Sequence, residues 1–229
     1  MSGRLAVIGK RETLPTPDGE RVGDDLPIVE AGAHLAAYRH GLGAHVPAHR
    51  IDHAAMLRRL RDLGCDRVLG ISSVGSLRLD LRVGTFLAPH DFIALDQPPL
   101  AAVDGPAQHV VPGFAPTWRA RVHAVWSEHA TPPLVAEGIY WQTNGPRFET
   151  PAEVRFIATM ADVVGMTVAS ECVAANQLGM DYAAVCIVDN LGNGLDTTLL
   201  TEAEYARGLA TNRAALLAAL DAVLPRLAT

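Results

Sequence analysis

Three side chains of different chemistry lie close together in segment 144–167. Phe148 supplies an aromatic ring, Glu149 a carboxylate and Met166 a thioether. Grouped around one site, such side chains suit a small-molecule pocket with an apolar wall and a polar anchor. Thr150-Pro151-Ala152-Glu153 follows and is a typical helix start, with threonine as N-cap, proline at the first helical position and glutamate at the third. The segment therefore predicts a pocket wall fixed just before a helix.

Each of these residues also has an ordinary structural interpretation. A methionine such as Met166 is more often core filler, and Glu149 precedes a helix N-cap, where a carboxylate is common. Asn190 lies in the turn-like run Asn-Leu-Gly-Asn-Gly. Arg39 and His40 could form a solvated strand end. Only the combination of these residues favours a binding site.

Composition limits the function classes. The 229 residues suit one large domain or two small ones, and the net charge of −6 disfavours a general affinity for nucleic acid or anionic membranes. Three widely spaced cysteines without a CxxC motif suit a reducing cytoplasm rather than a disulfide framework or a zinc site. No apolar run approaches the roughly 18 residues of a membrane span. This composition therefore predicts a cytoplasmic protein. We expect no metal site, and no glycine-rich loop for a dinucleotide cofactor is visible.

Strands and helices alternate along the chain, without a linker or a repeat, which predicts a single α/β domain over residues 1–229. Strands are expected at 5–8, 33–39, 67–71, 86–95 with a break at Pro89, 134–141 and 183–188; helices are expected at 51–63, 117–129, from 150, at 171–178 and at 201–224. Phe156, Ile157 and Met160 would form the apolar face of the helix that starts at 150. The apolar face of the helix at 201–224 would consist of Tyr205, Leu209, Leu216, Leu220 and Val223. Residues 72–76 are expected to form a small-residue turn, so candidate site residues follow strand ends, where α/β sheets bind ligands.

Six short motifs occur in an order that resembles trimeric purine nucleoside phosphorylases and methylthioadenosine phosphorylases. They are Arg39-His40-Gly41 and residues 47–51, 72–77, 145–153, 161–167 and 188–194. Each motif is weak alone, but six in family order are specific. The resemblance implies an α/β fold with a mixed, partly barrel-like sheet surrounded by helices. It also implies a homotrimer.

The reaction implied by this resemblance is phosphorolysis, in which phosphate attacks the anomeric carbon of a purine nucleoside and releases the base and a pentose 1-phosphate. Phosphate is then a co-substrate, and no further cofactor is expected. Such a site needs an anion pocket, contacts to the sugar and hydrogen bonds to the departing base. The residues that the resemblance assigns to phosphate are Gly9, Arg39, His40, Ser72, Ser73 and Thr167.

The resemblance assigns the sugar and the base to other residues. Those placed around the nucleoside are His53, Val74, Gly75, Phe148, Glu149, Met166 and Asn190, and the catalytic set is His40, Glu149 and Asn190. Ionised Glu149 would accept from N1–H of a 6-oxopurine, and the Asn190 amide would donate to N7 or O6. Relatives that use 6-aminopurines usually carry aspartate at that position, so Asn190 predicts inosine, guanosine or a 5′-modified inosine. A shift of one residue in the alignment would place Asp189 at this position and would predict 6-aminopurine substrates instead.

The first loop departs from the family pattern. Relatives follow the first strand with Gly-Gly-Ser/Thr-Gly, whose amides cradle phosphate. This chain has Gly9-Lys10-Arg11-Glu12-Thr13, in which Lys10 is its single lysine. Lys10 and Arg11 could supply charge, or they could face solvent. Three alternatives to the 6-oxopurine phosphorylase therefore stay open: an enzyme of the methylthioadenosine type acting on 6-aminopurines, a phosphate-independent nucleoside hydrolase, and a non-catalytic nucleoside-binding protein.

Overall fold

The computed structural model describes residues 3–15, 19–22, 26–98, 100–197 and 200–229. Its strands are β1 (Arg4–Gly9), β2 (Ile28–Ala31), β3 (His34–Tyr38), β4 (Cys65–Ser76), β5 (Phe86–Leu87), β6 (Asp91–Ile93), β7 (Leu134–Val135), β8 (Ile139–Gln142), β9 (Val163–Gly165) and β10 (Asp181–Leu191). Its α-helices are α1 (His53–Asp62), α2 (Pro116–His129), α3 (Pro151–Ile157), α4 (Val168–Gln177) and α5 (Glu202–Leu227), with short 3-10 turns at Ala48–Arg50 and Gly105–Gln108. Within the described ranges, no helix is long and apolar enough to cross a membrane.

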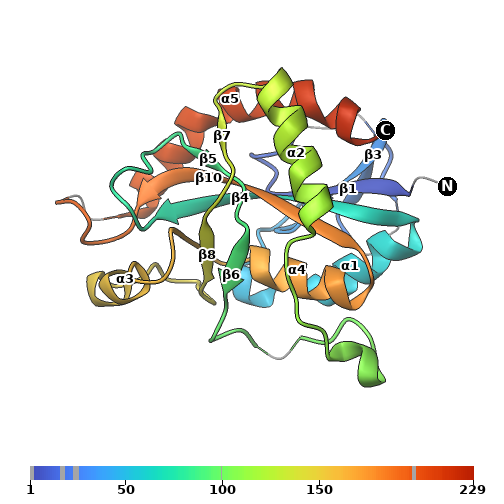
Figure 1. Ribbon diagram of the computed structural model, residues 1–229, viewed down its shortest axis with the longest axis horizontal. Helices are drawn as coiled ribbons and strands as arrows, with labels where there is room; N and C mark the ends of the chain where they lie inside the picture. The colour runs from blue at the N-terminus through green and yellow to red at the C-terminus, as the bar shows by residue number, and fades with distance from the viewer. Residues whose placement is uncertain (1–2, 16–18, 23–25, 99, 198–199) are drawn as a thin grey trace.

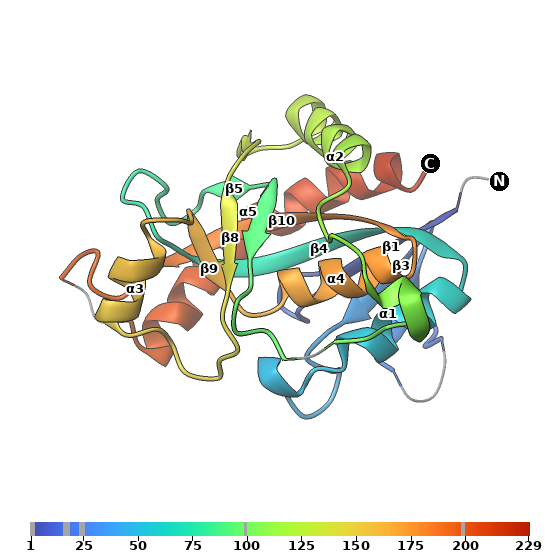
Figure 2. The same cartoon turned by 60° about the horizontal axis from the view of Figure 1, so that its bottom comes forward.

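The strands form one mixed sheet. Its main path runs β2-β3-β1-β4-β10-β5-β7, and a branch of β6, β8 and β9 joins the end of β4. The neighbours β3, β1, β4 and β10 are parallel, so their carboxyl ends share one edge. Helices α2 and α5 cover one face of this sheet, and α1 and α4 cover the other (Figures 1 and 2). The α/β class with a mixed sheet is confirmed, and the sheet stays open.

The central strands are apolar because both of their faces are covered. Leu5, Ala6, Val7 and Ile8 of β1 are all fully buried, as expected of parallel strands between two helical layers. One side of the sheet packs on Leu216, Leu220 and Val223 of α5, which matches the predicted face of that helix. The core on this side therefore combines a continuous apolar strand with one apolar face of α5.

Several elements of the structure differ from those predicted from the sequence. Residues 72–76 do not form a turn, because β10 pairs along β4 as far as Ser76 and extends that strand. The strand predicted at 134–141 splits into β7 and β8. The break at Pro89 occurs between β5 and β6 as expected. Strands β2 and β9 were missed, since each has four residues or fewer and forms only by pairing with its neighbours.

Helix α3 has the predicted start but a different buried face. The Thr150 hydroxyl accepts from Glu153 N–H while the Glu153 carboxylate accepts from Thr150 N–H, which makes a complete capping box. Phe156 and Met160, predicted to be apolar contacts, are 61% and 40% exposed, whereas Val154 and Ile157 are buried. The helix ends at Ile157, so Met160 falls beyond it.

Candidate active site

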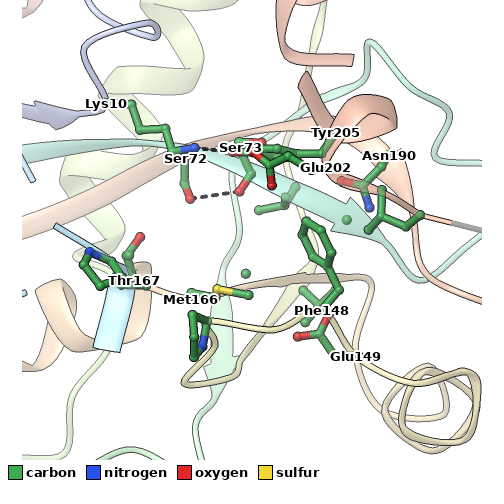
Figure 3. Close-up of a pocket in the computed structure, with 18 of the residues that line it drawn as sticks. Lys10, Ser72, Ser73, Phe148, Glu149, Met166, Thr167, Asn190, Glu202 and Tyr205 are labelled. Carbon is green, nitrogen blue, oxygen red and sulfur yellow. Dashed lines mark hydrogen bonds between the residues drawn. The ribbon is translucent and has the colours of Figure 1, made fainter. Parts of the chain in front are cut away.

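A cavity lies at the shared carboxyl edge of the parallel strands. Residues just after β1 and β3, near the ends of β4 and β10, and between β9 and α4 all contribute to its wall, and the first turn of α5 closes one side (Figure 3). The predicted site residues that line it are Arg39, His40, Ser72, Ser73, Val74, Gly75, Phe148, Glu149, Met166, Thr167 and Asn190. With the loop of Phe148 and Glu149, seven separate stretches of sequence therefore converge at the edge where α/β sheets bind ligands.

Arg39 is buried and bound to the protein on most sides. Its Nε and Nη2 donate to the two carboxylate oxygens of Glu171, at 2.5 and 3.0 Å, and Nη1 and Nη2 donate to the carbonyls of Ile71 and Ile8 at 2.7 and 3.2 Å. These four bonds leave one of the five guanidinium N–H groups for a ligand. The two parallel hydrogen bonds that an arginine can make to phosphate oxygens are made here to the carboxylate of Glu171.

Glu171 is a site residue that the sequence interpretation missed. It is fully buried in the first turn of α4 and accepts from the Tyr182 hydroxyl at 2.7 Å as well as from Arg39. Burial acts to lower the pKa of Arg39, but the Glu171 charge and hydrogen bonds outweigh it, so the pKa of Arg39 is raised. A glutamate inside the apolar stretch 168–175 was the available signal, because a buried carboxylate needs a partner.

His40 is neutral in this site. Its Nδ1 lies 2.8 Å from the Val46 carbonyl, which can only accept, so Nδ1 carries the proton and Nε2 is an acceptor. Burial, and secondarily the charge of Arg39, lowers the pKa of His40 to about 3. The imidazole stacks on His45, with ring centroids 4.8 Å apart, and His45 also lines the cavity. His40 can accept a hydrogen bond from a protonated phosphate oxygen or a sugar hydroxyl.

Hydroxyl groups line the same side of the cavity. Ser72 is buried and its hydroxyl makes a long contact, 3.3 Å, with the Ser73 carbonyl. Thr167 is the N-cap of α4, yet its hydroxyl caps no backbone N–H. The amides of Val168 and Ser170 at that helix start donate to the side chains of Tyr140 and Gln142. The Thr167 hydroxyl, rather than those helix amides, is therefore available to a ligand.

Two predicted residues lie away from this cavity. Gly9 ends β1 beneath the following turn, where an added Cβ would come within 2.7 Å of Leu14. His53 starts α1, is buried, and lies 3.9 Å from a Glu171 oxygen. Burial lowers the pKa of His53 to about 4. It lines a neighbouring cavity that shares Met166 with the first.

Phe148, Glu149 and Met166 lie together as the sequence suggested. In Figure 3 Phe148 and Met166 form the wall opposite Ser73 and Asn190. The Thr143 hydroxyl donates to Glu149 Oε1 at 2.7 Å and fixes that carboxylate. Gly145 has a φ of +61°, and an added Cβ would come within 2.5 Å of Met166 Sδ. Glycine at 145 therefore permits the turn that packs this loop on the methionine.

A β-bulge settles which of two neighbouring side chains faces the cavity. Val188 pairs with Val74 and Asn190 pairs with Gly75, so Asp189 is the extra residue. Asn190 lines the cavity, whereas Asp189 accepts from Asn212 of α5 at 2.7 Å and is buried. Asn190 Nδ2 donates to the Leu191 carbonyl at 3.0 Å, which leaves its second N–H and its oxygen for a ligand. The amide, not the carboxylate, therefore faces the site.

Two further wall residues come from ends of the chain far apart in sequence. The Lys10 ammonium contacts the Tyr205 hydroxyl and lies 4.7 Å from the centre of that ring. Tyr205 also packs against Phe148, with ring centroids 5.9 Å apart. Sequence periodicity placed Tyr205 on the apolar face of its helix, but α5 starts at the cavity, so its first turn faces a ligand site rather than the core.

The family model described as Phosphorylase superfamily matches residues 1–225. The chain belongs to this superfamily. The resemblance seen in the six motifs is thereby confirmed at the level of the family.

This phosphorylase superfamily member is similar to two relatives and to one solved structure. A probable 6-oxopurine nucleoside phosphorylase of Archaeoglobus fulgidus is 40% identical over 157 residues, which are 69% of this chain and 64% of that protein, just under two thirds of its length. A probable S-methyl-5'-thioinosine phosphorylase of Methanothermobacter thermautotrophicus is 31% identical, with 99% of this chain and 79% of that protein covered. Methylthioadenosine phosphorylase from Schistosoma mansoni, solved with adenine, has a TM-score of 0.81 at 20% identity over 98% of this chain and 90% of that chain, so the two share a fold.

Proposed function

We propose that the protein is a purine nucleoside phosphorylase for 6-oxopurine nucleosides, inosine, guanosine or a 5′-modified inosine. The observation that carries this proposal is the position of Asn190 in the cavity while Asp189 faces α5. An amide can donate to N7 or O6 of a 6-oxopurine, but it cannot supply the proton that helps a 6-aminopurine to leave. Two relatives whose names specify 6-oxopurine and thioinosine substrates support the same preference.

In this proposal the base lies between Phe148 and the opposite wall. Glu149, held by Thr143, accepts from N1–H, and Asn190 donates to the other edge of the ring. A phosphate oxygen forms the new bond to the anomeric carbon, and the bond to the purine nitrogen breaks with its electron pair moving into the base. Asn190 stabilises the charge that grows there, a contribution that is stronger in the transition state than in the ground state.

The nucleophile would lie on the other side of the ribose, near Met166. Ser72 and Thr167 offer hydroxyl donors there, Arg39 offers its one remaining N–H, and neutral His40 accepts from a protonated phosphate oxygen. Phosphate is the co-substrate, and no other cofactor takes part in this scheme. Ser73, Val74 and Gly75 of β4 complete the wall next to the sugar and base.

The proposal extends to the whole protein. Residues 1–229 form one nucleoside phosphorylase-like domain, and three copies assemble into a homotrimer, as the resemblance implies. The three cysteines are free and buried, which suits a cytoplasmic location. Small molecules, a purine nucleoside and phosphate, are its partners, and neither nucleic acid nor membrane binding is part of this function.

The decisive measurement is base release with and without phosphate. Inosine, guanosine and 5′-methylthioinosine should each be tested against adenosine and 5′-methylthioadenosine, following the free base. We expect release from 6-oxopurine nucleosides that requires phosphate and yields pentose 1-phosphate. Release without phosphate would identify a hydrolase, and binding without turnover would identify a non-catalytic protein; either result would overturn the proposal.

An Asn190→Asp variant tests the observation on which the preference rests. A carboxyl group at this position can accept from the 6-amino group and protonate N7, so the ratio of adenosine to inosine kcat/KM should rise by roughly 10-fold or more. Asp189→Asn is the matched control, because that side chain faces α5, and it should leave the ratio unchanged. A ratio that responds to Asp189 rather than Asn190 would contradict the assigned register.

A further inference from the structure

Arg39 and His40, two of the residues expected to bind an anion, offer little unpaired positive charge. Arg39 is ion-paired with Glu171 and donates four of its N–H groups to the protein. His40 is neutral and its Nδ1–H is donated to Val46. A phosphate dianion needs charge-assisted hydrogen bonds to displace its hydration shell. The wall formed by Arg39 and His40 therefore requires a further cation.

Three backbone amides of the loop after β1 are already used within the loop. Lys10 N–H donates to the Thr13 hydroxyl at 2.9 Å, while the amides of Thr13 and Leu14 both donate to the Lys10 carbonyl. The amides of Lys10, Thr13 and Leu14 therefore bond within the turn and do not point to a ligand. The Lys10 side chain is the part of this loop that reaches the cavity.

Lys10 has the position and the spare donors for this role. It lines the same cavity as Arg39, His40 and Ser72, and its charge is among those that lower the pKa of His40. The hydrogen bond that the structure gives it is to a neutral phenol, Tyr205, which leaves two of its three N–H donors. The half-buried position strengthens its attraction for an anion relative to bulk water.

We propose that Lys10 is the principal cation that binds the phosphate co-substrate, and that the Tyr205 hydroxyl holds the ammonium when phosphate is absent. Phosphate oxygens replace this hydroxyl as the acceptor. The inference rests on the proposed phosphorolysis. In this assignment the Lys10 side chain binds phosphate, which a glycine-rich loop would bind through its backbone amides. Tyr205 thereby connects the anion region to Phe148 on the base side.

A kinetic comparison of three variants tests the assignment. Lys10→Gln should raise KM for phosphate by roughly 10- to 100-fold, the usual effect of losing a charge-assisted hydrogen bond, while KM for inosine changes less than about 3-fold. Lys10→Arg, which keeps the charge, should recover part of the phosphate affinity. Arg11→Gln removes a neighbouring, exposed charge from the same loop and should change neither constant. Equal effects of Lys10→Gln and Arg11→Gln, or an unchanged phosphate KM in Lys10→Gln, would overturn the assignment.

Chemical labelling gives a readout that does not depend on turnover. Lys10 carries the only lysine amine of the chain, so an amine-selective acylating reagent followed by peptide mass spectrometry reports on this one side chain, with the N-terminal amine as internal reference. Inorganic phosphate should slow acylation of Lys10 several-fold, and sodium chloride at matched ionic strength should not. Equal labelling with both salts would contradict phosphate binding at Lys10. Protection in an enzyme that releases base without phosphate would refute the phosphorolysis and leave the anion site standing.

Discussion

The buried pair of Arg39 and Glu171 links a predicted ligand residue to an unpredicted one. Their exposed side-chain fractions are 2% and 0%, and Tyr182 adds a third member to the network. The pair holds the guanidinium at the wall of the cavity and leaves one N–H for a ligand. Glycine at position 70 makes room for this arrangement, because an added Cβ would come within 2.1 Å of the Tyr182 hydroxyl.

Removing one charge of this pair should destabilise the fold. Glu171→Gln leaves the Arg39 charge buried without its counter-ion, so the free energy of unfolding should fall by about 3 kcal/mol. Urea denaturation followed by circular dichroism measures it. The exposed pair of Arg78 and Asp80 provides the control, since Asp80→Asn should have no measurable effect. If both variants lost a similar free energy of unfolding, burial would not be what makes the Arg39–Glu171 pair strong.

At the scale of elements, α5 has two functions along its length. Its first turn carries Glu202 and Tyr205 into the cavity wall, and its later turns pack on the sheet. Between them Gly208 lies directly against β10, where an added Cβ would come within 1.8 Å of the Asp189 carbonyl oxygen. The missing side chain at 208 is what allows the helix to cross the strand that carries Asn190.

Gly208→Ala should therefore disturb both stability and binding. Alanine favours a helix by about 1 kcal/mol over glycine, but the close contact should reverse this gain and cost about 1–3 kcal/mol. The helix start should move away from β10 and raise KM for inosine. Ala214→Gly, on the exposed side of the same helix, should lower stability slightly without changing KM. A stabilised Gly208→Ala variant with unchanged KM would disprove the close contact.

The elements that could be predicted from sequence are those with local causes. The capping box at Thr150 and the apolar run of β1 depend on neighbouring residues alone, and both were found as expected. Residues 72–76 were wrongly predicted as a turn, because their strand conformation is imposed by β10. The partner of Arg39 lies 132 residues away, a contact that only the crossing of α4 over the sheet creates. Lining residues were therefore easier to predict than the roles of their side chains.

For the whole molecule, buried histidines make stability depend on pH. Burial lowers the pKa of His40 to about 3 and of His53 to about 4, whereas both titrate near 6.5 in the unfolded chain. Between pH 6.5 and about 4 the unfolded state therefore binds more protons than the folded state. The free energy of unfolding then falls on acidification. Asp189, whose pKa burial raises, acts in the opposite direction just above its ordinary value of 3.8.

Urea midpoints measured at pH 7, 6 and 5 check this expectation. Each of the two histidines should contribute a slope of up to about 1.4 kcal/mol per pH unit below 6.5. His53→Gln should reduce the slope, whereas His109→Gln, at an exposed position, should leave it unchanged. A stability that stays constant from pH 7 to 5 would show that these imidazoles gain protons in the folded protein.

Strand β10 holds an amide and a carboxylate at adjacent positions, and its bulge directs only the amide to the cavity. Insertion of one residue before Asp189 would shift every later side chain by one position along the strand. Asp189 would then occupy the place of Asn190, and the amide would leave the cavity. Under the proposed function, adjacent positions therefore carry the determinants of both base preferences, and an insertion of one residue would exchange one preference for the other without any amino-acid substitution.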